Sequence, residues 1–94
     1  MKLKHIKTRN IEYHIDNQKR KQGKYIEYYG DGEVAVICNY KDDCCNGEYT
    51  LWYSSGQICC QCYYKDGKYH GKYRWWDKQG KIIQKIIYDN GELK

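Results

Sequence analysis

The chain repeats itself with a period of 24 residues, and this period limits the possible folds more than any other feature. Glycine, tyrosine and a larger aromatic residue recur in one register over three copies. The recurring positions are Gly23, Gly47 and Gly71; Tyr25, Tyr49 and Tyr73; Tyr28, Trp52 and Trp76; Gly32, Gly56 and Gly80; and Tyr40, Tyr64 and Tyr88. A repeat of this length is one supersecondary unit that buries its apolar surface only against its neighbours. The period therefore predicts an array of similar units.

Each copy has the pattern of a β-hairpin. A glycine opens a run of aromatic and other strand-forming residues, as in 23–29, 47–53 and 71–77. A turn with glycine in its third position follows, and that glycine suits a backbone with positive φ. The second half of each copy, such as 34–40, alternates apolar and polar residues in the manner of a strand. This alternation places Val34, Val36, Cys38 and Tyr40 on one face.

The first copy is incomplete, because only residues 11–16 show the alternation of a second-half strand. An offset of 24 residues would place polar side chains on the apolar face, so the buried face requires a shift of one residue. The matched pairs are then Ile11 with Val34, Tyr13 with Val36, and Ile15 with Cys38. This match predicts that the loop 17–22 is one residue shorter than its counterparts.

The predicted fold is all-β, an elongated single-layer antiparallel meander of repeated β-hairpins with about seven strands. It forms one domain over residues 1–94, with a partial unit at 5–22 and whole units at 23–46, 47–70 and 71–94. No window shows the apolar spacing and end caps of an amphipathic helix.

Composition narrows the class of protein further. The chain has 94 residues and a formal net charge of +5, but its basic excess lies in residues 1–24. A nucleic-acid-binding protein would carry a continuous basic face, so a nucleic-acid partner is not expected. The basic start lacks the apolar run of a signal peptide, and no apolar stretch is long enough for a spanning helix. We expect a cytoplasmic protein, encoded by a genome of low GC content because Lys, Ile, Asn and Tyr are abundant.

Two segments resemble repeats of a known family. They are Tyr40-Lys-Asp-Asp-Cys-Cys-Asn-Gly-Glu-Tyr49 and Tyr64-Lys-Asp-Gly-Lys-Tyr-His-Gly-Lys-Tyr-Arg-Trp-Trp76, the latter closed by Gly80. Both are similar to the variant class of MORN repeats, and the resemblance covers residues 17–94. The second unit departs from the family pattern, with Asp43 at the place of the turn glycine and Cys44-Cys45 in the loop.

The resemblance implies an elongated sheet of hairpins that serves as a scaffold or binding module, associated with proteins or lipids. Similar repeats occur in bacterial proteins classed as antitoxins and in the repeat-rich gene sets of giant DNA viruses. The family has no shared catalytic residues, so the resemblance carries over no catalytic set and no cofactor. We expect a protein that is not an enzyme.

The six cysteines are interpreted mainly as structural thiols. Cys38 and Cys62 lie two strands apart in the predicted sheet, about 9.6 Å, which is too far for a disulfide. Cys59 and Cys62 form a C-x-x-C pair, but a strand would turn them to opposite faces, unlike a zinc knuckle. We therefore expect Cys38, Cys60 and Cys62 to be small buried side chains. A metal site and a disulfide remain as alternatives, and Cys44-Cys45 are the candidate reactive thiols.

Histidines and aspartates give no catalytic arrangement. His70 stands just before the repeat glycine, a position that the repeat often fills with histidine, and no third residue orients it toward a nucleophile. Asp42, Asp43 and Asp66 fit turns better than acid–base pairs. The sequence therefore supplies no catalytic, metal or cofactor residues.

The aromatic residues have two readings, as the core of a thin sheet or as a recognition surface, because Trp and Tyr are enriched at binding hot spots. The candidate binding residues are Trp75, Trp52, Trp76, Tyr49 and Tyr73. Trp75 shares a column with Glu27 and Leu51, so we expect it to be the most exposed of them.

The last predicted strand, 82–88, is apolar on both faces and is followed only by a short segment. Ile83 and Ile87 would then lie on an unprotected sheet edge, which natural proteins usually cover or charge. We expect a protein partner or a homodimer at this edge. Two alternatives stay open. One is an adaptor on an anionic membrane surface through Lys2, Lys4, Lys7 and Arg9, and the other is an antitoxin-like binder of a toxin.

Overall fold

The computed structural model describes residues 2–94, and within them every regular element is a β-strand, which confirms the all-β prediction. The strands are β1 (Lys4–Lys7), β2 (Ile11–Ile15), β3 (Gly23–Tyr28), β4 (Val34–Lys41), β5 (Cys44–Cys45), β6 (Gly47–Trp52), β7 (Ile58–Lys65), β8 (Lys68–Tyr69), β9 (Gly71–Trp76), β10 (Ile82–Asp89) and β11 (Glu92–Leu93).

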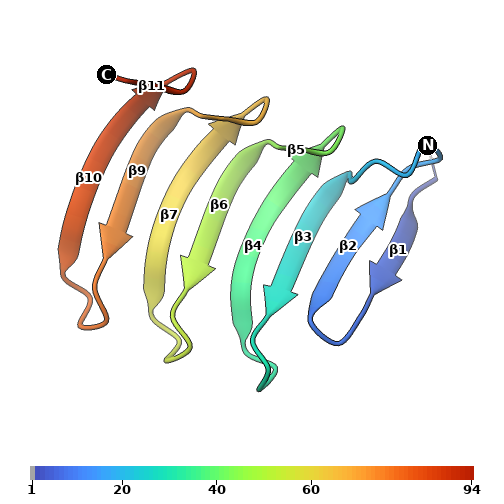
Figure 1. The fold of residues 1–94 in the computed structure, drawn as a ribbon, viewed down its shortest axis with the longest axis horizontal. Coiled ribbons are helices and arrows are strands. Elements are labelled where there is room, and N and C mark those ends of the chain that lie inside the picture. The colour runs from blue at the N-terminus through green and yellow to red at the C-terminus, as the bar shows by residue number, and fades with distance from the viewer. Residues whose placement is uncertain (1) are drawn as a thin grey trace.

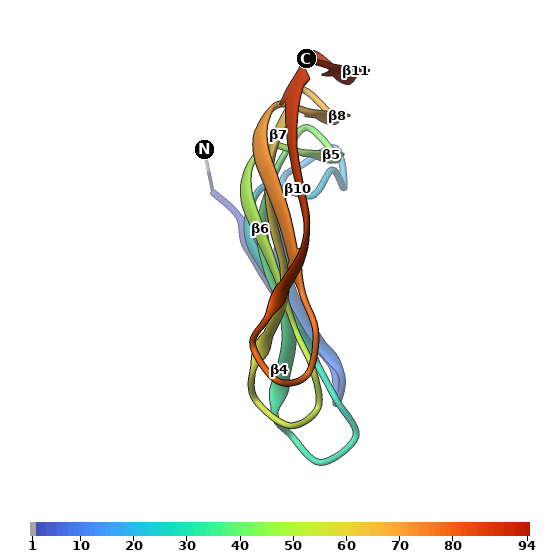
Figure 2. The ribbon, with the colours of Figure 1, turned by 90° about the vertical axis from the view of Figure 1, so that its left-hand side faces the viewer.

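All strands belong to one open antiparallel sheet (Figure 1). The order is β1-β2-β3-β4-β6-β7-β9-β10-β11, with β5 paired to β4 and β8 paired to β7. The sheet measures 41 × 35 × 12 Å, and Figure 2 shows it edge-on as a thin twisted slab. Its radius of gyration is 14.5 Å, whereas a compact domain of this length would have about 12 Å. The single-layer meander is therefore confirmed.

The strand count is higher than the sequence predicted, at eleven instead of about seven. β1 pairs along its whole length with β2, so the first copy is a hairpin and not a lone strand. Each long strand of a complete copy also folds back into a two-residue strand: β5, β8 or β11. The turn before β8 shows how: Asp66 and Gly67 have φ of 51° and 84°, the tight hairpin turn with two positive φ values.

The register of β2 corrects the predicted match of the first copy. Ile11 pairs with Glu27, whereas one repeat later Val36 pairs with Leu51. Ile11 therefore stands in the place of Val36, and the loop after β2 is one residue longer than its counterparts, not shorter. The need to bury the apolar side chains required a shift by one residue, but a shift in either direction along the chain satisfies it.

Asp16 holds this longer loop together. This residue is only 6% exposed, and its carboxylate accepts hydrogen bonds from the side-chain amide of Gln22 and from the backbone N–H groups of Gln18 and Arg20. The Arg20 guanidinium also donates to it, at 2.9 Å. These bonds, that of Gln22 foremost, hold the pKa of Asp16 well below its usual range.

A β-bulge interrupts each complete hairpin near its closed end. Glu27 pairs with Val36, but Tyr28 then pairs with Val34, which leaves Ala35 as the extra residue. The same shift follows Leu51 in the second hairpin and precedes Gln84 in the third. Because Tyr28 points away from Glu27, the bulge turns Val34 to the face opposite Val36. The prediction that Val34 shares a face with Val36 is therefore wrong.

The core lies on one face, which we call the tyrosine face. Tyrosines and small side chains alternate across this face, in the order Tyr25, Cys38, Tyr49, Cys62, Tyr73 and Ile86. The small residues leave room for the rings, which pack edge to face within each hairpin. The ring centroids of Tyr25 and Tyr40, for example, are 5.3 Å apart. Cys38 and Cys62 are each 2% exposed and Cys60 is 5% exposed, which confirms their predicted burial.

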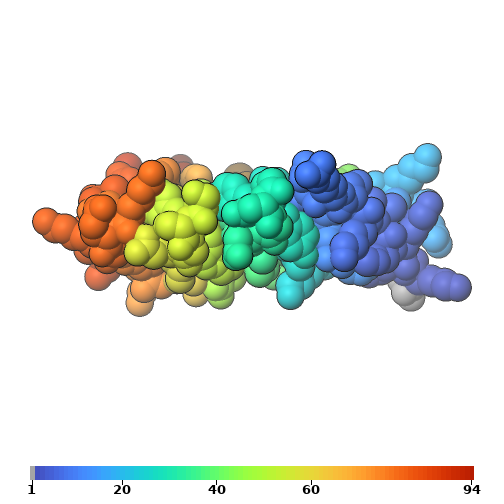
Figure 3. Space-filling view, turned by 90° about the horizontal axis from the view of Figure 1, so that it is seen from below, coloured from blue at the N-terminus to red at the C-terminus, as the bar shows by residue number. Residues whose placement is uncertain are grey.

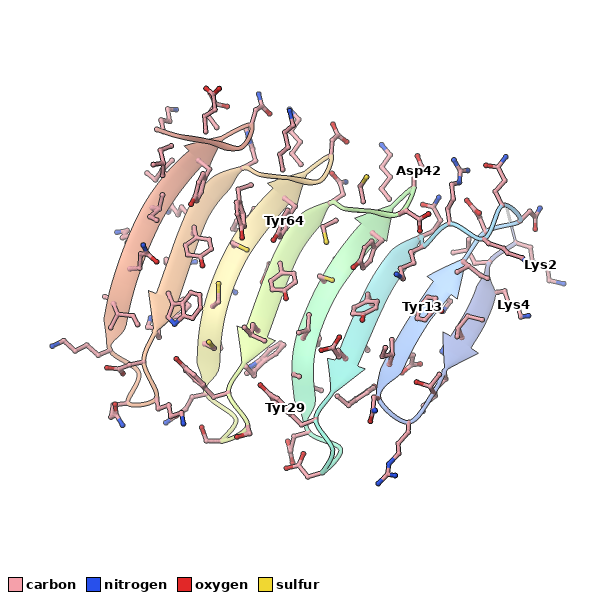
Figure 4. All side chains as sticks on the ribbon, viewed as in Figure 1. Lys2, Lys4, Tyr13, Tyr29, Asp42 and Tyr64 are labelled. Carbon is pink, nitrogen blue, oxygen red and sulfur yellow. The ribbon has the colours of Figure 1, made fainter. Side chains whose placement is uncertain are left out.

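Hydrogen bonds join successive hairpins at both ends of the sheet. At the ends near β5, β8 and β11, a turn N–H donates to a carbonyl of the preceding copy: Asp43 to Lys21, Gly67 to Cys45 and Gly91 to Tyr69, at 3.1, 3.0 and 2.7 Å. At the opposite ends, the hydroxyls of Tyr29 and Tyr53 donate to the carbonyl oxygens of Trp52 and Trp76. Figure 4 shows Tyr29 at these hairpin ends. Each unit is thus bonded mainly to its neighbours, as the repeat predicted.

Candidate functional site

The structure divides the five predicted aromatic binding residues between the two faces of the sheet. Tyr49, Tyr73 and Trp75 lie on the tyrosine face, in the cross-strand rows described above. Trp52 and Trp76 lie on the other face, which we call the tryptophan face. They therefore cannot form one surface together.

The tyrosine face is aromatic and uncharged at neutral pH over most of its area. Burial raises the pKa of Tyr49 to about 12 and, with a hydrogen bond to Glu27, that of Tyr25 to about 12. The ammonium group of Lys21 covers this face at its N-terminal end, 5.3 Å from the ring centroid of Tyr40. The rings are half-buried by one another and by these covering groups, so this face serves mainly as the core.

Trp75 is half-buried, as are the other four candidate binding residues, so the prediction that it is the most exposed of them stays a prediction. Its indole lies beside the ring of Tyr73, with centroids 6.4 Å apart, and its strand partner on one side is Cys60. The neighbouring small thiol leaves space for the indole, as it does for the tyrosines.

The tryptophan face contains a hollow near the closed ends of the last two hairpins. The hollow has a volume of about 300 Å³ and is lined by Gln57, Ile58, Trp76 and Gly80. Ile58 is 38% exposed and Trp76 is half-buried, so the lining is largely apolar and faces solvent. Figure 3 views the slab from these hairpin ends, which follow one another in chain order.

Basic side chains stand beside this hollow. The guanidinium carbon of Arg74 lies 5.5 Å from the ring centroid of Trp76, within the range of a cation–π interaction. Arg74 also donates from Nη2 to the side-chain oxygen of Gln61 at 3.0 Å, while its Nε is buried without a hydrogen-bond partner. Lys85 pairs directly with Arg74 across the strands and therefore shares its face. We call Ile58, Trp76 and Arg74 with the hollow the basic–apolar site.

The predicted C-terminal edge is open in the structure. The outer side of β10 pairs only with β11, at Tyr88–Leu93 and Asp89–Glu92. Ile83 and Ile87 are 59% and 47% exposed. Gln84 and Lys85 occupy the positions through which β4 and β7 pair with the following copy. Within residues 2–94, no strand lies beside them on this outer side. β10 therefore offers unpaired backbone and exposed isoleucines.

The basic residues of the N-terminal segment are spread over both faces. Lys4 pairs with Ile15 and Lys7 pairs with Glu12, and their odd separation in β1 points them to opposite faces. Figure 4 shows Lys2 and Lys4 at the N-terminal edge of the sheet. Arg9 lies outside the strands, in the connection between β1 and β2. The four residues predicted for a lipid surface therefore do not share one face.

Sequence reasoning missed Ile58 and Arg74 as site residues. The alternation in 58–64 places Ile58 with Cys60 on the tyrosine face, and only the bulge at Cys59 reverses it. The signal for Arg74 was available, because it lies two residues before Trp76 and side chains two apart in a strand share a face.

The buried thiols differ in acidity. Burial raises the pKa of Cys38 to about 12, so this thiol is poorly suited to act as a nucleophile at neutral pH. A hydrogen bond with the Cys62 thiol instead lowers the pKa of Cys60 to about 7. Within residues 2–94, no three His, Cys, Asp or Glu side chains are placed to hold a metal ion together. The same residues include no helix with the length and apolarity needed to cross a membrane.

Fold and surfaces together define a repeat scaffold of stacked β-hairpins, with surfaces suited to binding. The family model for the MORN repeat variant matches residues 21–42, 46–66 and 69–94. The chain therefore belongs to the MORN repeat variant family, as its sequence predicted. Repeats of this family are interaction scaffolds for proteins or membranes. Searches of curated proteins and of solved structures gave no match.

Proposed function

We propose that this chain is a non-enzymatic scaffold that binds another protein, or a second copy of itself, through the outer edge of β10. The observation that carries the proposal is the open edge itself. Its exposed Ile83 and Ile87 flank a backbone segment that pairs with β9 on one side and, in the described part of the chain, with no strand on the other. Strand addition to such an edge satisfies the backbone groups and buries the isoleucines.

The size of the edge sets the strength of self-association. β11 already covers Tyr88 and Asp89, so the open part of the edge is shorter than the 35 Å extent of the sheet along its strands. A single strand edge of this length buries less than the roughly 1,200 Å² of a stable interface, so edge pairing alone gives a weak, concentration-dependent dimer. A protein partner that also covers part of a face binds more tightly.

Sedimentation equilibrium over a wide concentration range tests the proposal. The wild-type chain is expected to gain mass as its concentration rises, and Ile83→Lys with Ile87→Lys abolishes this gain by placing charges on the edge. Leu3→Lys is the matched control, because Leu3 is also an exposed apolar residue, 41% exposed, but lies at the other end of the sheet. The proposal is contradicted when the wild-type chain stays monomeric at all concentrations and the edge substitutions do not reduce the binding of protein partners in a pull-down.

The membrane alternative has weaker support, because the basic residues at 2–9 do not lie on one face. It predicts sedimentation with anionic vesicles that disappears at high salt. The antitoxin-like alternative is a special case of protein binding in which the partner is a toxin.

A further inference from the structure

The basic–apolar site lies on the tryptophan face of the last two hairpins, whereas the proposed edge contact runs along the backbone of β10 and shares only Ile87 with this face. Ile58 at 38% exposure and Ile82 at 44% exposure flank Trp76, since Ile82 is the cross-strand partner of Trp76 and Ile58 lines the same hollow. The described residues form a single layer, with no second layer to cover these side chains. A contiguous apolar group left open to solvent beside charged residues is typical of an interaction site.

The hollow is large enough for one side chain of a ligand but too small and open to enclose a whole small molecule. About 300 Å³ is at the lower limit of small-molecule pockets, and those pockets enclose most of their ligand. This hollow is an open recess between two hairpin ends, with only four lining residues. It has room for one large aliphatic or aromatic side chain whose backbone stays outside.

The tryptophan face carries several basic side chains near the hollow. Arg74 and Lys85 form a cross-strand pair on the tryptophan face, and Lys72 lies two residues before Arg74 on the same face. No carboxylate of residues 2–94 forms an ion pair with any of these three side chains. The arginine stacks on an indole and has no carboxylate partner, so its guanidinium can still donate a charge-assisted hydrogen bond to an external carboxylate.

The nearby acidic groups are engaged elsewhere. The Glu48 carboxylate accepts hydrogen bonds from Gln61 and Thr50, at 2.9 and 3.3 Å. The Asp77 carboxylate accepts the N–H groups of Gln79 and Lys81 within its own turn, at 2.9 and 3.0 Å. Asp77 lies one repeat after Tyr53. In the preceding copy, Tyr53 at this position donates its hydroxyl to a carbonyl of the next copy. The basic groups beside the hollow are therefore available to an external anion.

We propose that the basic–apolar site binds an acidic segment of a protein partner. One aliphatic or aromatic side chain of that segment fills the hollow against Ile58 and Trp76, and flanking carboxylates pair with Arg74 and Lys85. This inference rests on the proposed function in so far as that function requires a protein partner. It adds the surface and the chemistry by which the partner is selected.

A peptide fits this site better than a lipid surface does. A bilayer presents a broad plane of headgroups, whereas the hollow is a recess for a single side chain. The basic residues predicted for lipid contact also lie at the opposite end of a sheet 41 Å long. The two basic regions therefore do not form one membrane-binding surface.

The test uses a capped synthetic peptide with one leucine between runs of glutamate, titrated into the ¹⁵N-labelled full chain and followed by NMR. The indole N–H of Trp76 and the amide of Ile58 are expected to shift in a saturable way, while the indole of Trp75 on the other face does not. A peptide with lysine in place of glutamate, and one with serine in place of leucine, are expected to bind at least tenfold more weakly.

Variants of the chain separate the two components of the site. Arg74→Gln removes a charge-assisted contact and is expected to weaken peptide binding about tenfold. Ile58→Glu places a negative charge in the hollow, which repels the acidic peptide, and is expected to abolish binding. The dispersion of the NMR spectrum of this variant reports whether it still folds. The matched control is Lys24→Gln, on the same face but in β3. It is expected to leave the peptide affinity within a factor of two.

Three results would overturn the inference: no saturable shift at Trp76 and Ile58, equal binding of the lysine peptide, or binding of anionic vesicles that depends on Arg74 while the acidic peptide does not bind. The proposed edge function fails separately, when Ile83→Lys with Ile87→Lys leaves self-association and partner retention unchanged. Peptide binding at the hollow can then persist, and the loss of peptide binding likewise leaves an edge dimer intact.

Discussion

Replacing Cys38 by serine tests whether the tyrosine face is a packed core. The thiol of Cys38 is 2% exposed and lies between the rings of Tyr25 and Tyr49. Serine has nearly the same shape but a strongly polar hydroxyl, and burying a hydroxyl without a good partner costs about 1–3 kcal/mol. In a domain of this size each 1 kcal/mol lowers Tm by roughly 4–8 °C. Cys38→Ser is therefore expected to lower Tm by at least about 4 °C.

The assay is urea denaturation followed by tryptophan fluorescence, together with thermal unfolding. Cys44→Ser is the matched control, because Cys44 is exposed and its replacement is expected to change the free energy of unfolding by less than about 0.5 kcal/mol. The m-values of the two variants should agree, since neither changes the surface exposed on unfolding. Equal stability of Cys38→Ser and Cys44→Ser would refute the claim that the tyrosines and cysteines form a packed core.

The remaining predictions concern the links between units and the dependence on pH. Tyr53→Phe removes a 2.7 Å hydrogen bond between the last two hairpins and lowers Tm, whereas Tyr63→Phe, at an exposed ring, does not; equal Tm values would contradict this. The carboxylate of Asp16, whose pKa is lowered chiefly by Gln22, stabilises the fold when ionised. That contribution is lost as the pH falls below about 4, and Asp16→Asn is expected to flatten the acid limb of a stability–pH curve. Burial raises the pKa of Tyr49 to about 12, so the fold favours the neutral phenol. This contribution to stability is complete below pH 10 and is lost as the pH rises toward 12. Absorbance titration should show tyrosines that ionise only on alkaline unfolding.

The sequence was sufficient for the architecture because the repeat and the strand alternation act together. The period gives the number of complete hairpins, and the alternation gives the face that each buries, so Cys38 and Cys62 could be placed between tyrosines without coordinates. The open edge followed in the same way from the apolar run at the end of the last copy.

The errors arose where the period-2 alternation breaks. The bulges at Ala35 and Cys59 move Val34 and Ile58 to the opposite face, and no residue at these positions marks a bulge in the sequence. The extra residue in the loop after β2 depends on the hydrogen bonds of Asp16, which the parity of the buried face does not report. The hollow was missed for the first reason, since Ile58 belongs to it only because of the bulge.

Small-angle X-ray scattering at low protein concentration tests the central claim most directly, because every surface described here depends on an uncovered single-layer sheet. An uncovered sheet is expected to give a radius of gyration slightly above 14.5 Å, the value for its Cα atoms, and the pair-distance distribution of a flat particle. A radius near 12 Å, as for a compact globule of the same length, would contradict this claim.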